Sequence, residues 1–242
     1  VLNTVALSFN NGIDAVRGGI HLLPRVFTLQ NYKTVLGQQN IITGAYISVA
    51  RTVVGTILAL AANALLAYVV SRKRFLFRSQ LSLFWVITMY VSGGMIPTLI
   101  LYRNLGLTGT FWVYVIPGMI SVFNMLVLRT YMMGLPEGLE ESAQIDGAND
   151  FTIFVRIVSP LCKPVYATVA LFVAVGQWNS WFDVMLYNRM NTKYTTLQYE
   201  LMKLLSSVMQ QGGSATSAGQ GAAAAVTPVT VRAAATVVTM LP

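Results

Sequence analysis

Long apolar segments are the feature that most constrains this chain. Four of them carry at most one charged residue and reach the length at which a helix crosses the hydrocarbon core of a membrane, about 20 residues for ~30 Å. They are residues 46–70, 81–101, 111–133 and 165–187. Because backbone N–H and C=O groups in lipid must be satisfied internally, each segment is expected to be a helix. Residues 1–9 and 222–242 are also apolar and are interpreted as parts of a first and a last span.

The predicted fold is therefore all-α. It is a polytopic membrane helical bundle with about six spans in the full-length protein. The given sequence is expected to begin within the first span and to end within the last. Residues 1–242 are expected to form a single transmembrane domain. A stripe of slim residues in the first complete span, Gly55, Ala59, Asn63 and Ala67, indicates close helix packing. Asn63 is expected to bond to a neighbouring helix.

Composition excludes several other classes of protein. Hydrophobic residues make up 55% of the chain and charged residues only 10%, against roughly 25% charged in ordinary soluble domains. One cysteine, Cys162, and one histidine, His21, exclude a disulfide framework and clustered metal ligands. No metal, cofactor or nucleic-acid partner is expected. The net charge of +8 is instead interpreted as the excess of basic residues in the cytoplasmic loops of membrane proteins.

The orientation follows from one basic loop. Residues 71–78 contain four basic residues and no acid, so this loop is predicted to be cytoplasmic. Alternation of spans then places residues 134–164 inside and residues 102–110 and 188–221 outside. Residues 212–225, rich in Gly, Ser and Ala, are predicted to form an outer loop.

Some residues are expected to interrupt the spans or to lie near their ends. Met95 and Pro97 are predicted to shape a break in the second complete span, and Pro117 a break in the third. Three charged residues near span ends, Arg51, Arg129 and Asp183, are expected to extend toward the membrane surface.

The inner loop 134–164 has its own composition and helix signals. It contains five of the chain's eight acids: Glu137, Glu140, Glu141, Asp146 and Asp150. Pro136 can begin a short helix whose first turns are acidic, and Gly147 can end it. Asp146 or Asn149 can cap a second helix. The loop is therefore predicted to hold two short helices across the membrane face, suited to a groove on a partner.

This loop resembles a known motif. The run from Glu141 to Ala148, ESAQIDGA, followed by Phe154, Ile157, Pro160 and Pro164, closely resembles the "EAA" loop of binding-protein-dependent ABC importer permeases of the MetI-like type. The sequence departs from that pattern at Ser142 and Ser159. Further runs, GGMIP at 93–97, LGL at 105–107, IPG at 116–118, VFN at 122–124 and VGQWNSWFD at 175–183, resemble the LplC-like carbohydrate permeases, which are related to the maltose permease subunit.

The resemblance implies a function and a set of partners. Such a permease pairs with a second permease subunit in a bacterial cell membrane, two ATPase subunits bind beneath it, and an extracytoplasmic protein delivers the sugar. The residues that would couple the permease to the ATPase are Glu140, Glu141, Ser142, Ala143, Asp146, Gly147 and Ala148. The sequence contains no G-x-x-x-x-G-K-[ST] phosphate loop, so ATP would be bound by the partner subunits and the chain is not expected to be an enzyme.

The sequence signal for a sugar path is less specific than that for the inner loop. Side chains able to stack on sugars or bond their hydroxyls are Asn124, Trp178, Asn179, Trp181 and Asp183, although aromatic residues at membrane surfaces also act as anchors. Two other functions remain open: an ABC permease for a non-sugar solute, and an ion-coupled secondary transporter. The second is disfavoured because the middles of the spans carry amides and small residues instead of carboxylates.

Overall fold

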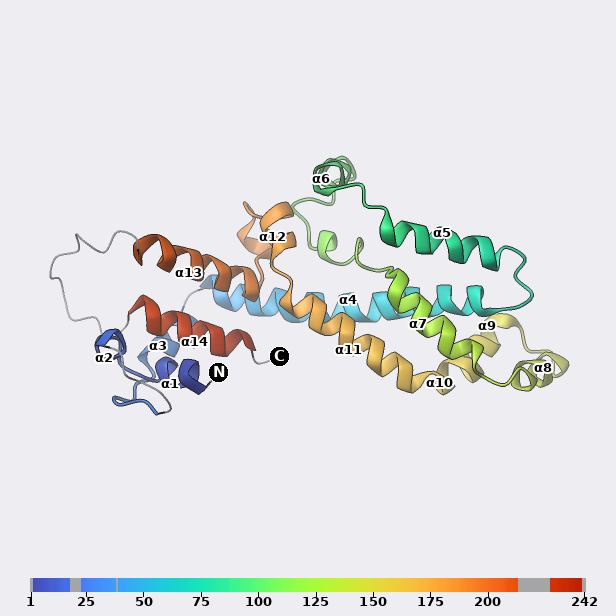
Figure 1. The fold of residues 1–242 in the computed structure, drawn as a ribbon, viewed down its shortest axis with the longest axis horizontal. Helices are drawn as coiled ribbons and strands as arrows, with labels where there is room; N and C mark the ends of the chain where they lie inside the picture. The colour runs from blue at the N-terminus through green and yellow to red at the C-terminus, as the bar shows by residue number, and fades with distance from the viewer. Residues whose placement is uncertain (1, 18–22, 38, 213–226, 241–242) are drawn as a thin grey trace. The chain divides into compact units, whose positions relative to one another are not determined.

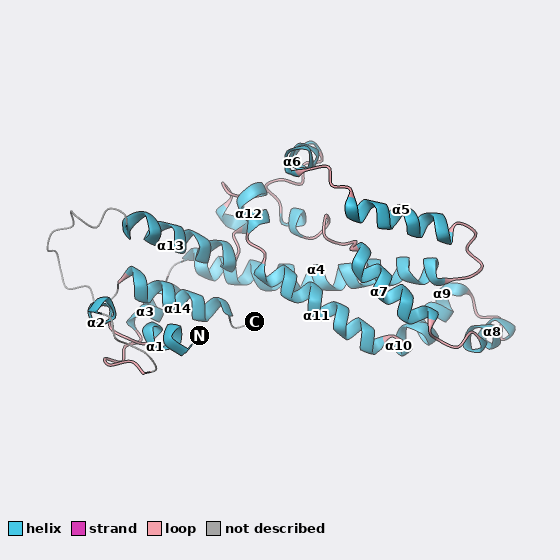
Figure 2. Ribbon diagram, viewed as in Figure 1, coloured by secondary structure: helices cyan, strands magenta, loops and turns pink. Residues whose placement is uncertain are grey.

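The computed structural model describes residues 2–17, 23–37, 39–212 and 227–240. Figure 2 shows that these residues form helices joined by loops, and an isolated antiparallel bridge pairs Asn10 with Phe27. The chain divides into two compact units. One comprises residues 1–49 and 178–242, and the other residues 50–177. The prediction of a single transmembrane domain stays a prediction.

The unit of residues 1–49 and 178–242 consists of short helices around the start of a long one. Its elements are α1 (Leu2–Ser8), α2 (Gly12–Arg17), α3 (Gln30–Leu36), the first part of α4 (Gln39–Ser71), α12 (Phe182–Tyr187), η3 (Thr192–Tyr194), α13 (Leu197–Gly212) and α14 (Pro228–Met240). Its buried apolar cluster joins α3, α4, α13 and α14 through Val35, Ile41, Leu197, Ala234 and Ala235. Helix α14 lies in the predicted last segment, and residues 213–226, which include most of the predicted Gly/Ser/Ala loop, are outside the described residues.

The unit of residues 50–177 holds the remaining elements. They are the rest of α4, α5 (Arg78–Tyr90), α6 (Met95–Asn104), η1 (Phe111–Tyr114), α7 (Val122–Met133), α8 (Gly138–Ile145), α9 (Asp150–Ile153), the π-helix η2 (Phe154–Val158), α10 (Ser159–Leu161) and α11 (Lys163–Asn179). Helices α7 and α11 pack against the second half of α4, and Figure 1 shows both of them slanting away from its axis. Their common core includes Ala67, Met125, Leu128, Val165 and Val169.

Helix α4 confirms the first predicted span. Its 33 residues correspond to about 50 Å at 1.5 Å per residue, which exceeds the ~30 Å hydrocarbon core. It is the one described helix long and apolar enough to cross a membrane alone, and two bent helix pairs raise the number to three if each pair is one span. The predicted packing stripe is also confirmed, because Ala59, Asn63 and Ala67 are buried and Gly55 lies against the side chain of Gln177.

The second predicted span is a broken helix. Helices α5 and α6 are bent by 113° at the break that follows Tyr90. Gly94 adopts a φ of +84°, which favours glycine. Pro97 lies in the first turn of α6, where a backbone N–H is not needed within the helix. The predicted break is therefore confirmed, and its backbone turn lies just before Met95.

The third predicted span is only partly helical, with α7 beginning at Val122 instead of near residue 111. The backbone between η1 and α7, which contains Pro117, has polar groups that a helix would otherwise satisfy. Asn63 of α4 supplies their partners: its Nδ2 donates to the carbonyl oxygen of Met119 at 2.9 Å, and its Oδ1 accepts from the N–H of Ser121 at 3.0 Å. The predicted bond from Asn63 is confirmed, but it reaches the broken backbone and not a neighbouring helix.

We therefore expect Asn63→Leu to destabilise the protein. The substitution leaves two backbone groups of residues 119–121 without a partner at membrane depth, which corresponds to about 1–3 kcal/mol of folding free energy per buried unsatisfied group. Thermal unfolding of the detergent-purified subunit should show a lower Tm than the wild type. Ile57→Ala, at an exposed position of the same helix, is the control and should lower the Tm less; an equal decrease would contradict the bridging role.

The expectation that Arg51 extends toward the membrane surface is wrong. Helix α4 begins at Gln39, so Arg51 lies well inside the helix, and the residue is 2% exposed. Its Nε donates to Oε1 of Gln177 at 3.0 Å, and its guanidinium lies 4.6 Å from the centre of the Tyr114 ring. A hydrogen bond and a cation–π contact thus favour a packed arginine over an extended one.

The fourth predicted span is shorter than expected. Helix α11 ends at Asn179, and a separate helix, α12, begins at Phe182. At its other end α11 is bent by 81° from the segment Asp150–Leu161. The short helices before α11 therefore belong to the inner loop, which contains the candidate site.

Candidate functional site

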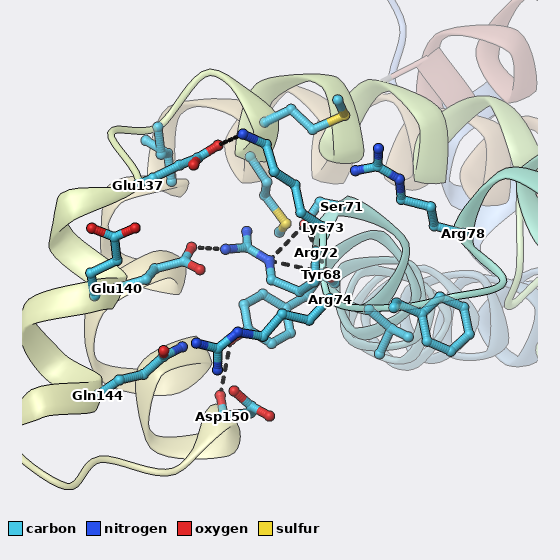
Figure 3. Close-up of a pocket in the computed structure, with 16 residues that line it drawn as sticks. Tyr68, Ser71, Arg72, Lys73, Arg74, Arg78, Glu137, Glu140, Gln144 and Asp150 are labelled. Carbon is cyan, nitrogen blue, oxygen red and sulfur yellow. Dashed lines mark hydrogen bonds and ion pairs between the residues drawn. The ribbon is translucent and has the colours of Figure 1, made fainter.

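A cleft of about 560 Å³ lies where the end of α4 meets the inner loop. Figure 3 shows the side chains that line it, from α4 and the following turn on one side and from α8 on the other. Four basic and four acidic residues line the cleft. The basic residues are Arg72, Lys73, Arg74 and Arg78, and the acidic residues are Glu137, Glu140, Glu141 and Asp150. The two loops predicted to be cytoplasmic are thus in contact with each other.

Two ion pairs join the walls of the cleft (Figure 3). Arg72 pairs with Glu140, and Lys73 pairs with Glu137. The Arg72–Glu140 pair is largely shielded, with side-chain exposures of 21% and 17%, whereas Lys73 and Glu137 are 72% and 63% exposed. Exposed pairs contribute little because water and salt screen them. The Arg72–Glu140 pair is therefore the stronger connection between α4 and α8.

Arg72 also contacts residues at the end of α4. Its Nε donates to Oγ of Ser71 at 3.0 Å and, more weakly, to the carbonyl oxygen of Tyr68 at 3.4 Å. The guanidinium lies 4.5 Å from the centre of the Tyr68 ring. Burial lowers the pKa of Arg72, and the carboxylates of Asp150 and Glu137 act in the opposite direction. An arginine remains charged at neutral pH, so the contact with Glu140 is a charge-assisted one.

Tyr68 connects this cluster to the rest of the inner loop. Its hydroxyl donates to the backbone carbonyl oxygen of Asp150 at 3.2 Å, and its ring lies 5.0 Å from that of Phe154. The end of α4 therefore contacts both short-helix segments of the loop, α8 through Arg72 and α9 with η2 through Tyr68.

The predicted helix signals of the inner loop are confirmed. Helix α8 begins two residues after Pro136, and Gly147, two residues after its end, takes a φ of +81°. Helix α9 is capped by Asn149, whose Oδ1 accepts from the N–H of Thr152 at 2.8 Å. Of the two caps considered from the sequence, Asn149 is the one used, and Asp146 ends α8 instead.

The coupling residues expected from the sequence lie on different sides of α8. Ala143 is buried in the core formed by α4, α7 and α11, and Glu140 faces the cleft. Glu141 and Ser142 are exposed. Adjacent helical residues point about 100° apart, so Glu140 and Glu141 cannot share one partner.

The remaining coupling residues form the bend after α8. Asp146 and Gly147 are exposed, and Ala148 is partly buried. The N–H of Ala148 donates to the carbonyl oxygen of Ala143 at 2.9 Å, across the bend. This bond helps to fix the direction in which the chain leaves α8.

Large apolar side chains of the inner loop are exposed, and one of them, Ile145, shares a helix face with Glu141 because it lies four residues later on α8. Ile145 is 87% exposed, Phe151 69% and Leu139 42%. Large apolar side chains at such exposure, next to an exposed carboxylate, are typical of a protein-binding surface. Leu139 points to another side of α8, so we call only Glu141, Ile145 and Phe151, exposed residues that can contact a partner, the outer face of the inner loop.

The residues expected for the sugar path are divided between the two units. Asn124 is buried in the first turn of α7, in the unit of residues 50–177, while the other four belong to the unit of residues 1–49 and 178–242. Trp178 donates through Nε1 to the carbonyl oxygen of Thr239, and Asn179 accepts from Gln198. Trp181 precedes α12, and Oδ1 of Asp183 accepts from the N–H of Val184.

Sequence reasoning did not assign a role to Arg72 or to its pairing with Glu140. Both charge clusters were visible, because the basic run 71–78 and the acids of the loop 134–164 were placed on the same side of the membrane. Opposite charges confined to one membrane face are a signal for pairing. The partners themselves depend on how α4 and α8 pack.

Comparisons with known proteins support the interpretation of these features. The family model described as "Binding-protein-dependent transport system inner membrane component" matches residues 51–186. The Polygalacturonan/rhamnogalacturonan transport system permease protein YtcP of Bacillus subtilis (strain 168) is 37% identical over 193 residues, which cover 80% of this chain and 68% of that protein. Protein LplC of the same strain is also 37% identical over 193 residues, covering 80% of this chain and 65% of that protein.

A solved structure extends the similarity to the whole chain. It is the crystal structure of a bacterial ABC transporter involved in the import of the acidic polysaccharide alginate, with a TM-score of 0.89 and 27% sequence identity. The match covers 100% of this chain and 85% of the matched one.

Proposed function

The chain belongs to the family of binding-protein-dependent transport system inner membrane components, and from that membership we propose that it forms part of the solute path of an ATP-driven importer for oligosaccharides or polysaccharide fragments. As a member of this family it is a multi-pass permease of the bacterial cell membrane and a transport subunit without an ATPase domain. The observation that carries the proposal is the outer face of the inner loop, which lies within the matched residues.

The outer face is proposed to bind the ATPase. Glu141 and Ile145 are exposed one turn apart on α8, Phe151 is exposed on α9, and none of these three contributes to the buried core. A short helix with an apolar face and one carboxylate suits a groove that offers a basic residue. Ser142, Asp146 and Gly147 extend the same exposed region, whereas Ala143 and Ala148 hold it against the permease.

Movement of the outer face can reach the spans directly. Helix α8 follows the end of α7 after a short connection, and α9, η2 and α10 lead on to α11. The π-helix η2 continues α9 without a loop, and such wide turns are frequent at functional sites. ATP binding by the partner subunits would then favour one of two arrangements of the spans, a population shift.

The proposed assembly contains more than this chain. Its partners are a second, different permease subunit, two ABC ATPase subunits that bind ATP, and an extracytoplasmic binding protein that delivers the sugar. About six spans are proposed for the full-length subunit. Membership in a binding-protein-dependent family supports the general form of this assembly.

A sugar is proposed as the solute because of the relatives. YtcP is named for polygalacturonan and rhamnogalacturonan, and the matched structure is of an alginate importer. Asn124, Trp181 and Asp183 stay candidates for sugar contacts. Trp178 and Asn179 already bond to α14 and α13, which supports a structural role for both.

Reconstitution tests the proposed function. The full-length subunit would be purified with its neighbouring-gene permease, the ATPase and the binding protein, and placed in proteoliposomes with ATP on the ATPase side. We expect uptake of labelled oligogalacturonides that requires ATP and is unaffected by a proton ionophore. Uptake of amino acids alone would contradict the sugar assignment. Uptake abolished by the ionophore but independent of ATP would instead establish an ion-coupled transporter.

A further inference from the structure

The two glutamates in the first turn of α8 have different surroundings. Glu141 lines the cleft too but is exposed and belongs to the outer face, whereas Glu140 is partly buried and pairs with Arg72 at the end of α4 (Figure 3). Neither the ATPase-binding role of the outer face nor the sugar path accounts for the Arg72–Glu140 pair. Its two residues come from segments that lie far apart in the sequence.

The geometry around Arg72 is that of a fixed connection. The guanidinium contacts the Tyr68 ring, Ser71 and Glu140, so it is held on the α4 side and on the α8 side at once. The Ser71 hydroxyl in turn donates to the carbonyl oxygen of Tyr68 at 2.7 Å. Ser71 is the last residue of α4, so these contacts act on the end of the one long helix described.

Helix α4 has no short covalent route to α8. Along the chain, α8 adjoins α7, and α11 follows through α9 and α10, whereas α5, α6 and α7 separate α4 from α8. A displacement of α8 therefore reaches α7 and α11 through the backbone. It reaches α4 only through noncovalent contacts, of which the Arg72–Glu140 pair is the shielded charged one.

We propose that Arg72 and Glu140 are positioning residues that transmit the movement of α8 to α4, so that the long span moves together with α7 and α11 when the ATPase subunits close. The inference rests on the proposed function, because it requires that an ATPase moves α8. It adds a second path of coupling, separate from the contact between the outer face and the ATPase.

Charge reversal tests the proposal. The variants are Arg72→Glu, Glu140→Arg and the double variant with both changes, each in the complete importer reconstituted in proteoliposomes. The measured quantity is solute transported per ATP hydrolysed. We expect each single variant to lower this ratio at least fivefold while the ATPase subunits still co-purify, and the double variant to recover at least half of the wild-type ratio.

The exposed pair provides a matched control. Lys73→Glu and Glu137→Lys make similar charge changes at the neighbouring ion pair of the cleft, where both side chains are mostly exposed. They should change the ratio less than twofold. Should charge reversal prevent folding, Glu140→Gln removes the charge at nearly constant shape and should lower the ratio about threefold.

The outcomes separate this inference from the proposed function. A wild-type complex that neither binds the ATPase nor takes up solute defeats the proposed function. A wild-type complex that transports normally, together with single variants or Glu140→Gln at the wild-type ratio, overturns only the role of Arg72 and Glu140. Failure of the double variant to exceed the singles would also overturn it.

Discussion

Replacing Glu141 with lysine is expected to reduce solute uptake to background while the subunit stays in the membrane. The residue is exposed on α8 and belongs to the outer face, so the change removes a carboxylate from the surface proposed to bind the ATPase and puts a like charge against its basic partner. Charge-assisted hydrogen bonds contribute about 1.5–3 kcal/mol, and leaving the partner's charge unpaired adds to the loss. Uptake by vesicles at matched protein levels is the measurement.

Two further variants separate docking from general effects of charge. Gln80→Lys adds a positive charge at an exposed position of α5 near the same basic loop and should leave uptake unchanged. Glu141→Gln keeps the shape and should lose only part of the activity. Retention of full uptake by Glu141→Lys would show that the outer face does not couple the permease to an ATPase.

The sequence was most informative where local chemistry decides the structure. Helix α4 could be predicted because an uninterrupted apolar segment in lipid has few alternatives to a helix. The ends of α8 and α9 could be predicted because Pro136, Gly147 and Asn149 act on the backbone within a few residues. These features do not depend on packing between distant segments.

The sequence was least informative where a residue's hydrogen bonds or ion pairs come from a distant segment of the chain. Hydropathy and Pro117 predicted a third span with a break, but they did not predict that the backbone before α7 is non-helical and is satisfied by Asn63 of α4. The burial of Arg51 likewise depends on Gln177 and Tyr114, which are far away in the sequence. The Arg72–Glu140 pair also depends on packing. The sequence predicts that each residue is a charge at the cytoplasmic face, but only the packing of α4 against the inner loop determines which residues pair.

Gly147→Pro is expected to abolish uptake through the backbone alone. Gly147 has a φ of +81°, and proline fixes φ near −65°. Proline also removes the N–H that donates to the carbonyl oxygen of Gln144 at 3.0 Å. The bend after α8 would have to change direction, and the outer face would lose its fixed relation between Ile145 and Phe151. Uptake and ATPase co-purification should therefore be lost together, with the variant still present in the membrane.

Graded variants at the same position show whether conformation is the cause. A Cβ atom at Gly147 would have no heavy atom of another part of the chain within 4 Å, so a small side chain meets no obstacle and only the positive φ is costly. The left-handed conformation costs most L residues about 1–2 kcal/mol, and asparagine adopts it more readily than alanine. Uptake should consequently fall in the order Gly147→Asn, Gly147→Ala, Gly147→Pro. Equal activity of the asparagine and proline variants would mean that the bend is not what positions α8 for the ATPase.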